Sequence, residues 1–86
     1  MARLSRGEAR WYRFARPDKK RPVVILTRDS VLEYLDETTV APVTRTVRGI
    51  PSEVPLGPED GLPEACAVNL DHVQTVARAR LGALIT

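Results

Sequence analysis

The sequence predicts a small, mostly antiparallel β barrel of the SH3-like or OB-like kind, with one or two short helices. Short strand candidates alternate with loops rich in proline and glycine. The chain has 86 residues, enough for one domain over residues 1–86 and too few for two independent cores. Hydrophobic residues make up 43% and charged residues 28%, a globular composition that excludes disordered and collagen-like classes.

The first part of the chain predicts a β hairpin followed by a short helix. Residues 8–14 (EARWYRF) alternate as a strand, and the turn at 15–20 (ARPDKK) has a Pro-Asp pair at its centre. Residues 22–27 (PVVILT) form a continuous apolar run that is typical of a buried strand. Asp29 or Ser30 is expected to cap a short helix that ends by residue 35.

A strand at 38–43 (TTVAPV) comes next, and it contains Pro42. Because proline has no N–H to donate to a ladder, we expect this residue at a sheet edge or a bulge. Gly49 and Pro51 indicate that residues 45–50 form a loop, and a short strand is expected over 52–56.

The last third of the chain begins with a surface loop at 55–63, where prolines and glycines are dense. Residues 64–70 and 71–76 then predict one or two strands. A helical turn over 77–81 is expected to stop at Gly82, and residues 83–86 are candidates for closing the sheet.

The formal net charge of +2 hides an uneven distribution. Residues 1–21 carry eight basic and two acidic side chains, whereas the rest of the chain carries five basic and nine acidic ones. Such a basic end indicates a surface for a polyanion, and a solvated N-terminal arm explains it equally well.

Compartment and assembly follow from the same composition. No apolar stretch approaches the ~20 residues that span a bilayer and no signal peptide is recognisable, so a cytoplasmic protein without a membrane segment is expected. The single cysteine, Cys66, is predicted to be a reduced, packed thiol. A domain of this size buries only roughly 60–65% of its unfolded surface, which favours an oligomer.

Metal and cofactor chemistry are disfavoured. One His, one Cys and scattered carboxylates do not supply the ligand spacing of a metal site, and none of the isolated glycines builds a phosphate-binding loop. Cys66 and His72 could form a nucleophilic pair, but a buried thiol is the commoner state. We therefore expect no metal and no cofactor.

Arg, Lys, Thr and Ser side chains near strand ends suit phosphate binding and a phosphodiester transition state. Metal-free RNA cleavage needs little else. The ribose 2′-hydroxyl attacks its own phosphate, so the protein must accept one proton, supply another and stabilise the added negative charge.

Four segments of the chain are informative together: RGEARWYRF at 6–14, KKRPVVIL at 19–26, VAPVTRTVRGIPSEVPL at 40–56 and ACAVNLDHVQTVARARLG at 65–82. In this order they resemble the MazF/PemK-like family of toxin endoribonucleases. The most specific elements are the Arg-Pro pair that opens the apolar strand and the Ala-Pro-Val-Thr strand end that leads to Gly-Ile-Pro.

The resemblance implies an SH3-like barrel that dimerises, cuts single-stranded RNA at short sequences without a metal, and is neutralised by a cognate antitoxin. It assigns catalytic roles to Arg21, which would stabilise the phosphorane and is a candidate for protonating the leaving oxygen, and to Thr44, which would hold a non-bridging oxygen. The base that takes the 2′-hydroxyl proton is left open. Candidate RNA-binding residues flank these two positions: Arg13, Arg16, Lys19, Lys20, Thr46 and Arg48.

Simpler roles exist for several of these side chains. Arg21 could pair with Asp18, Thr44 could be an ordinary strand residue, and His72 could be packed rather than act as a base. The aromatic residues of strand 8–14 could stack on bases or fill the core.

Two departures from the family pattern keep other functions open. The turn at 15–20 is shorter than the family's loop and lacks its Gly-Ser-Glu-Gln type segment, and the family's C-terminal helix is missing before the chain stops at Thr86. The alternatives are a non-catalytic toxin on the same barrel, like the related gyrase poisons, and a module that only binds RNA.

Overall fold

The computed structural model describes residues 4–13 and 20–86 as a mostly β structure. Seven antiparallel strands of the described chain form one connected sheet system in the order β4-β5-β3-β2-β1-β7, and β6 pairs with β3. The strands are β1 (Ala9–Arg13), β2 (Lys20–Ile25), β3 (Glu37–Thr44), β4 (Glu53–Leu56), β5 (Cys66–Asn69), β6 (Gln74–Ala77) and β7 (Leu81–Leu84). This confirms the predicted fold class.

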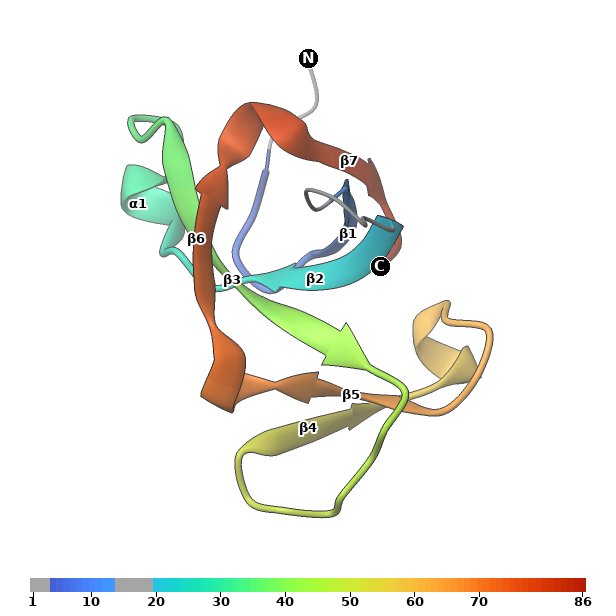
Figure 1. Cartoon of the computed structure of the whole chain (residues 1–86). Coiled ribbons are helices and arrows are strands. Elements are labelled where there is room, and N and C mark those ends of the chain that lie inside the picture. The colour runs from blue at the N-terminus through green and yellow to red at the C-terminus, as the bar shows by residue number, and fades with distance from the viewer. Residues whose placement is uncertain (1–3, 14–19) are drawn as a thin grey trace.

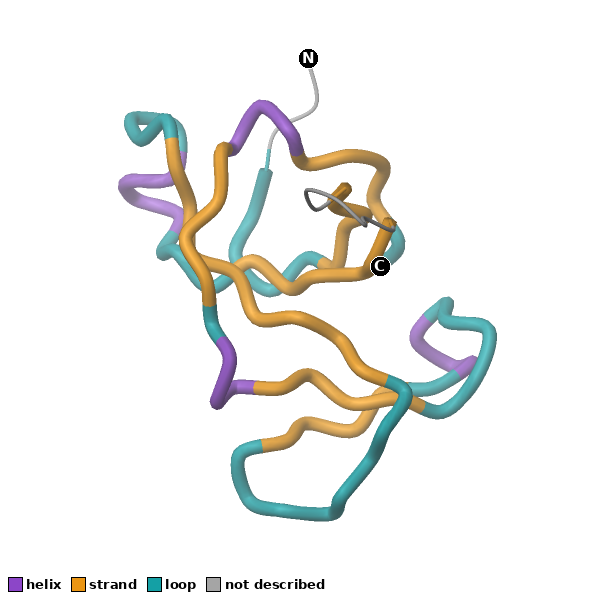
Figure 2. The backbone as a smooth tube through the Cα atoms, in the orientation of Figure 1, coloured by secondary structure: helices purple, strands orange, loops and turns teal. Residues whose placement is uncertain are grey.

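The helical elements are short. They are α1 (Asp29–Leu32) and three 3-10 turns, η1 (Pro58–Asp60), η2 (Leu70–His72) and η3 (Arg78–Arg80). As Figures 1 and 2 show, η3 links β6 to β7 and carries the chain back over β1, so the sheet curves into a barrel-like shape. No helix of the described residues is long and apolar enough to cross a membrane.

Two apolar clusters lie on opposite faces of β3. Its Val40 packs with Val23, Ile25 and Leu32 inside the barrel, whereas its Ala41 and Val43 pack with Leu62, Cys66 and Val68 in a second cluster. Val40 and Ala41 are both fully buried although they point to opposite faces. Strand β3 therefore belongs to both cores and connects the barrel to the β4–β5 hairpin.

Pro42 does not lie at a sheet edge, one of the two places expected for it, and its register with β2 is unbroken. It is opposite Val23 within β3, an inner strand. On the other side of β3, pairing with β6 ends at Val40 and pairing with β5 begins at Val43. The missing N–H is tolerated because Pro42 falls in the gap between these two partners.

Other sequence predictions differ in detail. Helix α1 has no side-chain cap, because Asp29 accepts a hydrogen bond from the backbone N–H of Arg6 at 2.6 Å and lies inside the helix. Residues 70–72 form a 3-10 turn rather than part of a strand, with the Asn69 side chain accepting a bond from Asp71 N–H. Gly82 lies within β7 and does not end a helix. The predicted turn at 15–20 lies largely outside the described residues.

Candidate functional site

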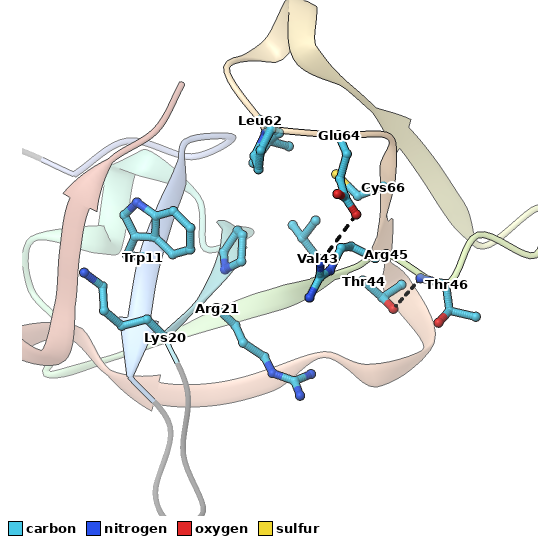
Figure 3. A pocket seen from close by; sticks show the side chains of 12 residues that line it. Trp11, Lys20, Arg21, Val43, Thr44, Arg45, Thr46, Leu62, Glu64 and Cys66 are labelled. Atoms are coloured by element: carbon cyan, nitrogen blue, oxygen red, sulfur yellow. Dashed lines mark hydrogen bonds and ion pairs between the residues drawn. The ribbon is translucent and has the colours of Figure 1, made fainter.

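A pocket of about 440 Å³ opens where β2 begins and β3 ends, beside the loop that leads into β5 (Figure 3). Its lining combines cationic, hydroxyl and apolar groups. The residues are Trp11, Lys20, Arg21, Pro22, Val43, Thr44, Arg45, Thr46, Leu62, Pro63, Glu64 and Cys66. Segments far apart in the sequence are thus joined at one site.

Arg21 and Thr44, the two residues predicted to be catalytic, line this pocket from neighbouring strands. Strands β2 and β3 are antiparallel, with Val23 opposite Pro42. Continuing that register by one two-residue step puts Arg21 opposite Thr44, and side chains two residues apart on a strand share a face. The observed β2–β3 pairing ends at Val23 and Pro42, so Arg21 and Thr44 lie just beyond it on one face, with Arg21 exposed and Thr44 half-buried.

The Thr44 hydroxyl is held in place by the chain that follows it. Its oxygen accepts a hydrogen bond from the backbone N–H of Thr46 at 3.1 Å. The next loop is fixed by Glu53, whose Oε1 accepts from the N–H groups of Arg48 at 2.9 Å and Gly49 at 3.0 Å. Gly49 has a φ of 70°, which suits glycine in a tight loop. The hydroxyl proton of Thr44 remains available for a ligand oxygen.

The aromatic residues of β1 divide between the core and the pocket. Tyr12 is buried inside the barrel, whereas Trp11 is half-buried and lines the pocket. The Lys20 ammonium lies 5.6 Å from the centre of the Trp11 ring, within the range of a cation–π contact. Phe14 lies outside the described residues.

The predicted RNA-binding residues are only partly brought together. Lys20 and Thr46 line the pocket with Arg21 and Thr44. Arg13 is exposed at the end of β1 and Arg48 is exposed in the loop after β3, and neither lines the pocket. Arg16 and Lys19 lie outside the described residues.

Two charged residues of the pocket were missed by sequence reasoning. Arg45 Nη1 lies 3.5 Å from Glu64 Oε1, and their side chains are 79% and 56% exposed. Arg45 directly follows Thr44, and Glu64 precedes the strand whose Ala67 pairs with Thr44. The pairing of β3 with β5 brings Arg45 and Glu64 together, and the sequence alone does not show that these two strands are neighbours.

Cys66 is the first residue of β5, and His72 lies in η2 beyond the other end of that strand. Cys66 is buried in the pocket wall, where burial first, and then the negative charges of Asp60 and Glu64, raise the pKa of its thiol. His72 is exposed in η2, with its Nδ1 2.7 Å from Asn69 Nδ2. Neither residue is placed for a joint nucleophilic role. Among the described residues, no group of three or more His, Cys, Asp and Glu side chains could hold a metal ion.

Comparison with known families gives a match over nearly the whole chain. The PemK-like, MazF-like toxin family of type II toxin-antitoxin systems matches residues 5–86. The chain belongs to this family. The resemblance stated from the sequence segments is therefore confirmed.

Curated members of the family are similar to the chain at high identity. Endoribonuclease MazF3 of Mycobacterium tuberculosis (strain ATCC 25618 / H37Rv) is 47% identical over 68 residues, which cover 79% of this chain and 66% of that protein. Probable endoribonuclease MazF5 of the same strain is 46% identical over 85 residues, covering 93% of this chain and 77% of that protein. The chain thus spans just under two thirds of the first relative.

Solved structures of the family have the same fold. Mycobacterium tuberculosis toxin MazF-mt6 superposes with a TM-score of 0.82 at 40% identity, covering 91% of this chain and 76% of that one. An endoribonuclease from mycobacterial species in complex with its cognate antitoxin gives 0.78 at 26% identity, covering 96% and 77%.

Proposed function

We propose that this chain is the toxin component of a type II toxin-antitoxin system and acts as a sequence-specific, metal-independent endoribonuclease on single-stranded RNA. The placement of Arg21 and Thr44 carries the proposal, since they share one face on neighbouring strands and line one pocket. Further support comes from the family's relatives, which are named endoribonucleases.

Arg21 and Thr44 supply electrostatic stabilisation to a reaction in which the ribose 2′-hydroxyl attacks the adjacent phosphorus. Arg21 binds the scissile phosphate and stabilises the extra negative charge of the phosphorane. Thr44 donates a hydrogen bond from its hydroxyl to a non-bridging oxygen. The bond that its oxygen accepts from Thr46 N–H holds the hydroxyl in place for this role. The P–O5′ bond breaks as the O2′–P bond forms, the 2′-hydroxyl gives up its proton, and the departing 5′-oxygen gains one, for which Arg21 is the candidate donor. The products are a 2′,3′-cyclic phosphate and a free 5′-hydroxyl.

Lys20 and Thr46, which line the same pocket, position the RNA backbone beside the scissile bond. Arg13 and Arg48 extend this contact on either side, and Arg16 and Lys19 are proposed for the same role on the sequence alone. Such contacts add affinity that depends on salt and carries little sequence information.

We also propose that residues 1–86 act as one domain, as a homodimer in the cytoplasm, and that a cognate antitoxin neutralises it. A relative solved with its antitoxin supports the last point. The apolar side chains of Val54, Leu70 and Val73, each 40–47% exposed, support a protein partner outside the pocket.

The test is cleavage of a mixed single-stranded RNA pool in excess EDTA, with mapping of the ends. Arg21→Ala is expected to lower the rate by roughly 10²–10³ or more, since it removes the cation that stabilises the phosphorane. Thr44→Val keeps the shape of the side chain and is expected to cost about tenfold or more. Arg28→Ala is the matched control, because Arg28 is an exposed arginine beside α1 and does not line the pocket.

Full activity of Arg21→Ala would remove Arg21 from the mechanism. A protein that binds RNA in a salt-dependent way without cutting it would be a binding module instead. A protein that leaves RNA intact but inhibits DNA supercoiling by gyrase would be the non-catalytic toxin.

A further inference from the structure

The pocket holds a carboxylate where a site for RNA phosphates alone would have none. Among the described residues that line it, Glu64 is the one acid, and its side chain points toward Arg45 (Figure 3). A negative charge repels phosphate, so this part of the pocket suits a group that donates hydrogen bonds. The exposed edge of a nucleobase is such a group.

We propose that Arg45, Glu64 and Trp11 bind the nucleobase next to the scissile phosphate and select guanine or cytosine at that position. This inference rests on the proposed function, because it takes single-stranded RNA as the ligand of the pocket. It assigns base selection to residues other than the Arg21–Thr44 pair.

The two parts of the pocket lie on different sides of the strands. Arg21 and Thr44 share one face of the β2–β3 ladder, and Val43, the neighbour of Thr44, points to the opposite face. Figure 3 shows Trp11 at one end of that second face and Glu64 at the other, with Val43 between them. Both groups of residues line one pocket where the strands end, so a phosphate at Arg21 and Thr44 and its attached base beside Val43 can occupy it together.

Trp11 supplies a stacking surface at this site. The ring is half-buried and lines the pocket, and Leu62 adds a buried apolar wall. Base–aromatic stacking contributes about 1–3 kcal/mol per base and tolerates every base. Stacking therefore holds the base in the pocket, and its identity must be read by polar groups.

Arg45 and Glu64 supply those polar groups as a donor beside an acceptor. An ionised glutamate only accepts hydrogen bonds and a guanidinium only donates them, and both can bind in a bidentate manner. Guanine offers the carboxylate N1–H and N2–H, and the guanidinium its O6. Cytosine offers N4–H to the carboxylate, and N3 with O2 to the guanidinium. Adenine can make one hydrogen bond to each side chain, through N6–H and N1. Uracil has a single donor, N3–H, and a carbonyl acceptor on each side of it.

The Arg45–Glu64 contact is suited to opening for a base. Its 3.5 Å separation and the 79% and 56% exposure of its side chains describe a surface ion pair. Such pairs contribute about 0–1 kcal/mol, so a base edge that satisfies both groups can replace the contact at little cost.

The first experiment compares the ends produced from a mixed RNA pool by the wild type, Glu64→Gln and Arg45→Gln. We expect wild-type cuts to require guanine or cytosine at one position beside the scissile bond. Both variants should weaken that preference by about 10- to 100-fold and leave preferences at other positions intact. Glu37→Gln is the matched control, since Glu37 is an exposed acid at the other end of β3 and should keep the wild-type motif. An unchanged motif in Glu64→Gln would overturn the proposal.

The second experiment measures binding without cleavage. Trp11 is the single tryptophan, so its fluorescence reports a stacked base directly. Short 2′-deoxy oligonucleotides that contain guanine or cytosine should quench it at about 10- to 100-fold lower concentration than uracil-containing ones, and Glu64→Gln should remove the difference. Equal quenching by all bases would overturn the inference. Base-selective quenching without RNA cleavage would instead overturn the proposed cleavage and keep base selection by Arg45, Glu64 and Trp11.

Discussion

Arg10 belongs to the basic N-terminal segment, yet the structure uses it to hold the barrel closed. Its side chain is 7% exposed, and its Nε donates to Glu8 Oε1 at 2.9 Å. Its Nη1 donates to the carbonyl oxygen of Gly82 at 3.0 Å, which ties β1 to β7. Replacing Arg10 with Met keeps a long apolar side chain and removes both bonds.

The expected loss follows from these contacts. Removing one partner of a buried ion pair costs about 3–5 kcal/mol. Glu8 is 20% exposed and also accepts from Ser5 N–H at 3.1 Å, so its carboxylate keeps part of its solvation. We therefore expect Arg10→Met to lower the free energy of unfolding by about 2–3 kcal/mol. A domain of this size has roughly 4–13 kcal/mol in total. The midpoint of thermal unfolding should fall by about 10–20 °C.

Thermal and urea unfolding followed by circular dichroism measure this loss. Arg28→Met is the control and should stay within about 0.5 kcal/mol, because Arg28 is exposed. Glu8→Gln combined with Arg10→Met should cost little more than Arg10→Met alone, since the two side chains share one bond. A midpoint shift below about 2 °C would show that Arg10 does not hold β1 to β7, and additive losses in the double variant would show that the Arg10–Glu8 bond adds no stability.

Two further predictions concern charge. Lys20→Gln should weaken RNA binding and reduce the slope of log affinity against log salt by about 0.7, the contribution of one phosphate contact, as measured with a non-cleavable RNA; an unchanged slope would remove Lys20 from the RNA path. Because the pKa of the Cys66 thiol is raised in the folded state, chiefly by burial, the folded protein holds that proton more tightly than the unfolded chain. The free energy of unfolding should therefore fall as the pH rises above the ordinary thiol value of about 8.5, and Cys66→Ala should lessen that fall in urea titrations between about pH 7 and 10; equal pH dependence in both proteins would contradict this.

Local patterns predicted the strands well and the site poorly. The apolar run in β2 and the alternation in β1 define strands from neighbouring residues alone. Arg21 and Thr44 are 23 positions apart, and they line one pocket because β2 pairs with β3, a register that no local pattern encodes. Only the family resemblance pointed to both. Glu64 was missed for the same reason, because its place in the pocket depends on β5 pairing with β3.

The sequence correctly predicted that Pro42 lacks a ladder bond on one side, but it did not predict where in the sheet this position lies. Proline marks a position without a donated ladder bond, which the sequence pattern assigned to a sheet edge or a bulge. In the structure it marks the point where β3 leaves β6 and takes β5 as its partner. Two residues later the strand ends at Thr44, opposite the start of β2 and beside the loop that carries Glu64. Because this exchange of partners brings β5 to the end of β3, the proposed phosphate and base sites lie in one pocket.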